Sequence, residues 1–199
     1  MNQAHVFQFK IVLNHIIPSI WRKVLAPSDY TFWNLHVAIQ DAMGWQDCHL
    51  HEFRIADPRM GSHFSIGIPD QEIVDDPQFL ASWEIEIAEL FSQSNPEALY
   101  IYDFGDWWEH TVTLEKVIAS QPDAAYPVCV AGERACPPED SGGPPGYQLF
   151  LEAIEDPNHE SHDQYREWIG GEFTAEQFDP SSVEFDDPLE RWNLAFGDK

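Results

Sequence analysis

The amino-acid sequence predicts an α+β fold, with a single domain built mainly on an antiparallel β-sheet, an N-terminal helix packed on that sheet and C-terminal helices. This fold class is predicted by the order in which strand-like alternation and helical spacing of apolar residues follow one another along the chain. Alternating apolar residues come first, one helical segment follows, more alternating segments come next, and helical spacing returns after residue 146. With 199 residues the chain is long enough to bury a core without disulfides or metals. We expect one domain over residues 1–199.

The N-terminal part of the chain predicts two strands and a helix. Residues 6–13 alternate between apolar and other side chains, as a half-buried strand does, and residues 20–25 predict a second, antiparallel strand. From residue 32 the apolar spacing is helical, with apolar residues at Phe32, Leu35, Ile39, Ala42 and Met43. The N-cap candidates are Ser28, Asp29 and Thr31. Gly44 suits a left-handed C-terminal stop.

The middle of the chain predicts a series of strands. Segments 50–55 and 64–68 read as strands, and 83–87 reads as a one-sided strand that passes into a short helical turn at 87–91. The clearest pair, 98–102 and 107–118, forms a hairpin across Asp103-Phe104-Gly105-Asp106, where Gly105 suits a positive φ. In its second strand the apolar face carries Trp108, His110, Val112 and Leu114.

Regular structure is predicted to stop at residues 119–146, which contain six prolines and four glycines. A loop of this length in a compact domain is usually either functional or disordered, and the two cysteines, Tyr126 and several prolines favour an ordered loop lying on the sheet. Beyond it, two helices are predicted by apolar residues at helical spacing. These residues are Tyr147, Phe150, Leu151 and Ile154, then His162, Tyr165, Trp168 and Ile169. The acidic tail, 186–199, contains a predicted last helix at 188–196.

The charge of the chain excludes one class of function. With 35 Asp plus Glu against 10 Lys plus Arg, the formal net charge is -25, so phosphates would be repelled and we expect no nucleic-acid partner. The acidic surface is either simply solvated or attracts a basic partner or cations. No apolar run reaches the roughly 18 residues of a membrane span, and the N-terminus lacks signal-peptide features. The three cysteines fit a reduced protein, so we expect a cytoplasmic location without membrane attachment.

Three groups of residues together resemble a known family. The first group comprises 35–40, 42–45 (Ala-Met-Gly-Trp) and 49–53 (His-Leu-His-Glu-Phe). The second comprises 102–106 (Tyr-Asp-Phe-Gly-Asp), 108–110 (Trp-Glu-His) and 114–116 (Leu-Glu-Lys). The third comprises 126–132 (Tyr-Pro-Val-Cys-Val-Ala-Gly), 135–140 (Ala-Cys-Pro-Pro-Glu-Asp), 142–143 and 146–147.

In this order the groups resemble the plasmid pRiA4b ORF-3-like family over about residues 4–185. The resemblance implies an antiparallel α+β domain and no established activity. Some members carry a name that links them to a transposon resolvase. DNA resolvase activity does not fit a chain with six arginines in all and this net charge.

Several candidate site residues have both a chemical and a structural interpretation. Asp103, Asp106 and His110 could bind a divalent metal or act as acid and base; alternatively, the two aspartates bond turn amides while His110 packs in the core. His49 and His51 would share a face of a strand and could clamp a metal. Cys129 and Cys136 could join them as zinc ligands or could be small buried side chains. We expect Arg134 to pair with Glu139, Asp140 or Asp103.

The leading hypothesis is a non-catalytic domain that binds a protein or peptide, basic in one interpretation of the charge, in a groove between the 98–118 hairpin and the 119–146 loop. The residues expected to line it are Asp103, Asp106, Trp107, His110, Arg134, Glu139 and Asp140. The alternative is a metal-dependent hydrolytic enzyme that holds zinc or another divalent metal. Its ligands would be drawn from His49, His51, His110, Cys129 and Cys136. No cofactor is established by the sequence.

Overall fold

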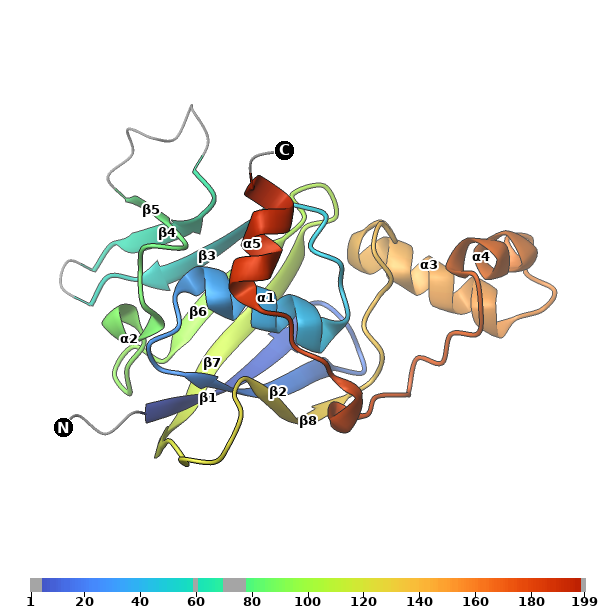
Figure 1. The fold of residues 1–199 in the computed structure, drawn as a ribbon. Coiled ribbons are helices and arrows are strands. Elements are labelled where there is room, and N and C mark those ends of the chain that lie inside the picture. Colours follow the sequence, from blue (N-terminus) through green and yellow to red (C-terminus); the bar gives the residue numbers. More distant parts are fainter. Residues whose placement is uncertain (1–4, 59–60, 70–77, 198–199) are drawn as a thin grey trace.

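The computed structural model describes residues 5–58, 61–69 and 78–197, and within them eight strands form one sheet (Figure 1). The strand order is β5-β4-β3-β6-β7-β1-β2-β8, and every neighbouring pair is antiparallel except β4 and β5. The strands are β1 (His5–Leu13), β2 (Ile20–Pro27), β3 (His51–Ala56), β4 (His63–Gly67), β5 (Phe79–Ala81), β6 (Glu97–Tyr102), β7 (Trp108–Ala119) and β8 (Val128–Glu133). The helices are α1 (Phe32–Met43), α2 (Ile87–Leu90), α3 (Gly143–Glu155), α4 (His162–Ile169) and α5 (Pro188–Phe196). The predicted α+β class is confirmed.

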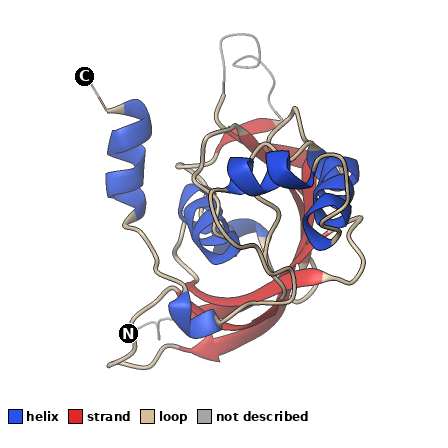
Figure 2. Ribbon diagram, turned by 90° about the vertical axis from the view of Figure 1, so that its right-hand side faces the viewer, coloured by secondary structure: helices blue, strands red, loops and turns tan. Residues whose placement is uncertain are grey.

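The core lies between the sheet and α1, and the sheet curves around the helices (Figure 2). Strand β1 is central, paired with β2 and β7, and its alternate residues are buried as predicted. Helix α1 begins after Thr31, whose hydroxyl accepts a hydrogen bond from the Asn34 amide, and ends at Gly44 with φ of 89°. Of the three N-cap candidates, Thr31 therefore has that role.

Several polar side chains of the strands are paired. Lys23 on β2 lies 2.9 Å from the Glu115 carboxylate on β7, and Arg54 lies 2.8 Å from Glu52, two residues earlier on the same strand, β3. These two cations therefore already have acidic partners. Among the described residues, no helix is long and apolar enough to cross a bilayer.

The hairpin of β6 and β7 is confirmed, but its strained positions differ from the prediction. Positive φ angles fall on Asp103 (57°) and Trp107 (58°), and not on Gly105. The Asp103 carboxylate accepts the Gly105 amide at 2.8 Å, so this side chain stabilises the turn instead. A tryptophan with positive φ is unusual, because its Cβ is crowded by the backbone in that conformation.

The prediction that residues 119–146 lack regular structure is wrong. Strand β8 forms within them and pairs with the free edge of β2, and α3 begins at Gly143. The prolines of this segment lie outside the β8 ladder, so they do not interrupt its hydrogen bonds. As a result, the first half of the segment lies at the far edge of the sheet from β3, separated from β7 by β1 and β2.

The prediction of a strand at 83–87 is also wrong, although the short helix predicted at 87–91 is present as α2. Its alternating residues lie in turns, and Glu86 makes only an isolated bridge with Thr31. The predicted C-terminal helices form as α3, α4 and α5. Phe150 of α3 is fully buried, whereas α5 has no buried residue and contacts Trp33 through Trp192.

Candidate functional site

The candidate site is built around the turn between β6 and β7. The backbone holds this turn firmly: the Asp103 amide donates to the carbonyl of Leu50 at 3.0 Å, and the Trp107 amide donates to the carbonyl of Asp103 at 2.6 Å. The first bond joins the turn to the residues just before β3. Two segments that are distant in the sequence are therefore fixed side by side, with Phe104 and Trp107 projecting from the turn.

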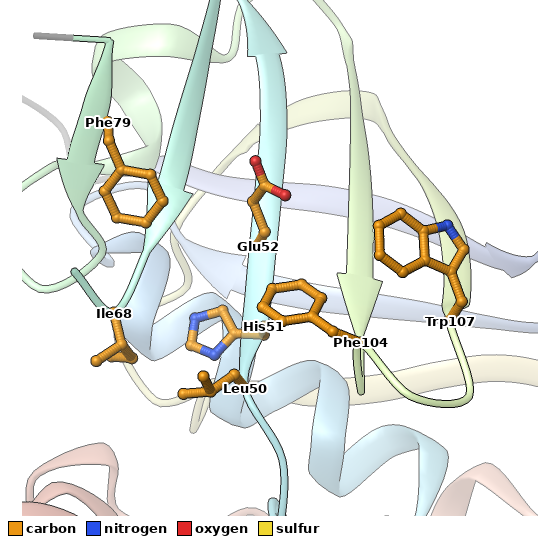
Figure 3. A pocket seen from close by; sticks show the side chains of 7 residues that line it. All are labelled: Leu50, His51, Glu52, Ile68, Phe79, Phe104 and Trp107. Carbon is orange, nitrogen blue, oxygen red and sulfur yellow. The ribbon is translucent and has the colours of Figure 1, made fainter. Parts of the chain in front are cut away.

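A pocket of about 430 Å³ opens beside this turn (Figure 3). Its lining is mostly apolar and comes from the start of β3, the end of β4, strand β5 and the turn. The lining residues are Leu50, His51, Glu52, Ile68, Phe79, Phe104 and Trp107. Leu50, Phe104 and Trp107 are 51%, 46% and 43% exposed, so three large apolar side chains surround one opening.

Two polar side chains contribute to the pocket. The Glu52 carboxylate accepts a hydrogen bond from Arg54 at 2.8 Å, and the Arg54 guanidinium lies 6.0 Å from the centre of the Trp107 ring. His51 is 3% exposed, and its Nε2 has no hydrogen-bond partner among the described residues. Figure 3 shows the His51 ring between Leu50, Ile68 and Phe104. This nitrogen is itself inaccessible to solvent, so it is a buried polar atom that carries a desolvation cost and not a group open to the pocket.

Behind His51 lies a buried hydrogen-bond network. The rings of His51 and His36 stack at 3.6 Å, and His36 contacts the Tyr100 hydroxyl through Nδ1 and Asp47 through Nε2. Since Gln40 donates to the Tyr100 hydroxyl, that hydroxyl can donate to His36 Nδ1, and Nε2 then carries the proton donated to Asp47.

Burial keeps this network free of imidazolium. It lowers the pKa of both His36 and His51 well below the usual value, and for His51 the neighbouring His36 adds to the effect. The close contact of His36 with Asp47 is therefore a hydrogen bond and not an ion pair. Burial also raises the pKa of Asp47 to about 6.

Carboxylates gather on the other side of the turn. His49 Nε2 lies 3.1 Å from Asp140 and 3.7 Å from Asp103, while Asp106 accepts the Gly142 amide at 2.8 Å. Glu139 accepts the Tyr102 hydroxyl at 3.0 Å. Ligand atoms of His49, Asp103 and Asp140 lie within 4.8 Å of one another, so these three could hold a divalent cation. The same geometry is accounted for by one imidazole pairing with two carboxylates.

Only some of the residues predicted to line a binding groove lie close together in the structure. Asp103, Asp106, Glu139 and Asp140 do gather at the turn, because residues 137–142 cross to it. Trp107 instead lines the pocket, which contains no residue of 119–146.

The other two residues predicted for the groove lie elsewhere. His110 is fully buried against Trp45, and burial lowers its pKa to about 4. The predicted partners of Arg134 are wrong: it pairs with Glu176 at 2.9 Å and donates to the carbonyl of Pro18. The segment that carries Arg134 follows β8, at the sheet edge remote from the turn.

The ligands predicted for zinc do not converge in the described part of the chain, where His49 joins the two aspartates instead. The expectation that His49 and His51 share a strand face is wrong, because β3 begins only at His51. Cys129 lies on β8 with its thiol directed to the Ala131 carbonyl. Burial raises the pKa of Cys136 to about 12, which disfavours the thiolate that a metal needs.

Four of the residues that line the pocket carried no signal in the sequence. Leu50, Ile68 and Phe79 are ordinary apolar residues at or next to strand ends, and Glu52 is a single acidic residue on β3. Phe104 could have been found, since an apolar side chain between the two aspartates of a tight turn has no nearby core to enter.

The chain is similar to a known protein family, to a protein from Sinorhizobium fredii and to a solved structure from Methanosarcina mazei Go1. The sequence model described as "Plasmid pRiA4b ORF-3-like protein" matches residues 5–182. The uncharacterized protein y4hQ of Sinorhizobium fredii is 34% identical over 193 residues, which cover 95% of each chain. The crystal structure of MM3350, a protein of unknown function from Methanosarcina mazei Go1, has a TM-score of 0.86 at 40% identity. The match covers 92% of this chain and 100% of that one.

Proposed function

The chain belongs to the plasmid pRiA4b ORF-3-like family, and we propose that it is a non-catalytic domain that binds a protein or peptide segment. The binding site is the pocket beside the turn of β6 and β7. One observation carries the proposal: Leu50, Phe104 and Trp107 all expose large apolar surfaces around one opening. Exposed apolar side chains that gather in this way are typical of interaction sites.

The rigidity of the turn supports recognition by this surface. Trp107 is held by a hydrogen bond from its indole nitrogen to Glu109 at 2.9 Å and by the backbone bond to Asp103. Because the aromatic rings are already positioned, little side-chain entropy is lost when a partner binds. The positive φ of Trp107 is the kind of backbone strain that clusters at functional sites.

The polar groups of the pocket favour binding over chemistry. Glu52 is bonded to Arg54, and His51 is a buried neutral imidazole stacked on His36. A cytoplasmic location is part of the same proposal and is supported by three free thiols, at Cys48, Cys129 and Cys136.

The test is selection of binders from a library of random peptides displayed on phage, using the immobilised full-length chain. Selected peptides are then synthesised and titrated against the unchanged protein, a Trp107→Ala variant and a Trp168→Ala control. Trp168 is 44% exposed, close to the 43% of Trp107, but it lies on α4 and not in the pocket.

We expect the Trp107→Ala change to weaken binding at least about tenfold, as loss of an aromatic hot spot does, and the control to bind normally. Circular dichroism confirms that both variants are folded. If every selected peptide binds Trp107→Ala as tightly as the unchanged chain, the proposed function is wrong.

A further inference from the structure

We infer that a divalent metal ion binds between His49, Asp103 and Asp140, on the side of the β6–β7 turn away from the pocket. His49 Nε2 lies 3.1 Å from Asp140 Oδ1 and 3.7 Å from Asp103 Oδ2, and the three ligand atoms lie within 4.8 Å of one another. Two atoms that bind one metal at about 2.0–2.2 Å are themselves about 3–4 Å apart. The spacing therefore suits one ion shared by the three side chains.

The buried carboxylate of Asp103 is the observation that points to an ion. This residue is 7% exposed, and its Oδ1 accepts the Gly105 amide at 2.8 Å. Its Oδ2 accepts no hydrogen bond from the described residues, because His49 Nε2, at 3.7 Å, is too distant and lies closer to Asp140. A buried carboxylate oxygen is costly unless a donor or a cation neutralises it, and the distances show that this oxygen faces the other two ligands.

The charge balance around the turn supports the same inference. Asp106 and Glu139 add two more carboxylates to the turn and to the segment that crosses it. In the part of the chain that the structure describes, none of these carboxylates or those of the ligands forms an ion pair with a lysine or an arginine, whose partners lie elsewhere. In a chain with a net charge of -25, a divalent cation supplies the positive charge that the local side chains lack.

Hydrogen bonds on both sides of Asp140 hold this ligand beside the turn. Its neighbour Glu139 accepts the Tyr102 hydroxyl at 3.0 Å, and the Gly142 amide donates to Asp106 at 2.8 Å. The backbone at Asp140 is therefore fixed although its side chain is 72% exposed. Outer bonds of this kind orient metal ligands before the ion binds.

The ligand types select the class of metal. One imidazole nitrogen with two carboxylate oxygens suits manganese, iron or zinc, whereas magnesium and calcium prefer oxygen ligands alone. The exposed side at Asp140 leaves room for water to complete the coordination.

Isothermal titration of the untagged full-length chain, first stripped of metal with a chelator, tests the inference with zinc, manganese and magnesium chlorides. The variants are His49→Ala, Asp140→Asn and a His15→Ala control. His15 is 65% exposed in its side chain and lies 3.0 Å from Glu109, so it is another exposed imidazole paired with a carboxylate.

We expect one zinc or manganese ion per chain, with zinc bound more tightly than manganese, and magnesium bound at least about tenfold more weakly than manganese. His49→Ala and Asp140→Asn should each weaken zinc binding at least about tenfold, and His15→Ala should leave it unchanged. Manganese at ten times its dissociation constant should raise the melting temperature of the unchanged chain by about 4 °C, and that of His49→Ala by about 1 °C or less.

An Asp103→Asn variant keeps an oxygen for the Gly105 amide and loses the charge, so it should also bind zinc more weakly, with circular dichroism as the check on its fold. The inference is overturned if neither zinc nor manganese binds, or if both bind His49→Ala and Asp140→Asn as tightly as the unchanged chain. An equal loss in His15→Ala would assign the ion to exposed histidines in general and would overturn it too. None of the three ligands lines the pocket, so the Trp107 test of the proposed function is independent of these results.

Discussion

Trp107 and Trp108 are neighbours in the sequence and lie in opposite environments. Trp108 is completely buried and packs beside Trp45, whereas Trp107 is 43% exposed and lines the pocket. The same contrast separates His110 and His36, which lie in the core, from His49, which is partly exposed and lies between the buried Asp103 and the exposed Asp140. Residue type alone therefore does not identify the candidate site in this protein. What marks it is the direction in which the turn presents each side chain.

The largest expected effect is on the buried member of the tryptophan pair. Trp108→Ala should lower the free energy of unfolding by about 3–5 kcal/mol, because a large cavity opens in the core. Trp107→Ala should cost about 1 kcal/mol or less, since part of that ring is already in water. Urea unfolding followed by circular dichroism measures both. Similar losses for the two variants would contradict the assignment of Trp107 to a recognition surface.

The second prediction concerns the pH dependence of the core. Burial lowers the pKa of His110 to about 4, from 6.5 for a free imidazole. As pH falls from 6.5 to 4, the unfolded chain takes up a proton here that the folded chain does not, so stability is lost on acidification. At pH 4 this group should cost about 3 kcal/mol relative to neutral pH.

A His110→Phe variant should lack this loss, because phenylalanine does not titrate. The informative quantity is the difference in unfolding free energy between the two proteins, measured from pH 7 to pH 4. Two curves that remain parallel over this range would show that His110 is accessible to protons in the folded state.

The third prediction uses the backbone conformation of the exposed tryptophan. At ordinary φ values, alanine stabilises a chain relative to glycine. At the positive φ of position 107 the order should reverse, with Trp107→Gly more stable than Trp107→Ala by about 1 kcal/mol. Thermal unfolding of the two variants gives the comparison. A more stable alanine variant would mean that the turn does not hold residue 107 in the left-handed region.

The smallest expected effect belongs to the exposed carboxylates. Asp140 is 72% exposed in its side chain, so Asp140→Asn should change stability by less than about 1 kcal/mol. Urea unfolding of the variant and of the unchanged chain gives this difference. A loss well above about 1 kcal/mol would show that the contact of Asp140 with His49 stabilises the turn.

The sequence predicted the fold better than the site, for physical reasons. The alternation in β1 and the helical spacing from Phe32 each show which side chains of a single element are buried. Those buried side chains form the core, so the elements that pack around it could be predicted. The course of residues 119–146 depended on a pairing with β2, which lies about a hundred residues earlier and leaves no local periodicity. The proline content favoured a loop, yet the prolines only flank the strand.

The same limitation applies to the site. Asp103, Asp106, Glu139 and Asp140 were predicted to meet because the 119–146 loop was expected to lie against the 98–118 hairpin, and residues 139–142 do reach the turn of that hairpin. The pocket depends on how the ends of three strands and a turn are aligned in space. Leu50 and Phe79 look like any other apolar residues until the sheet is assembled.

The loosely seated helix α5 has a consequence for the way the molecule opens. None of its residues is buried, it is attached mainly through Trp192 and Arg191, and it lies beyond residue 182, where the family match ends. Its backbone amides should therefore exchange with deuterium long before those of the central strands, in an opening that leaves the sheet intact. A protease should likewise cut first in the connection ahead of this helix, and release it as a separable appendage of an otherwise resistant body.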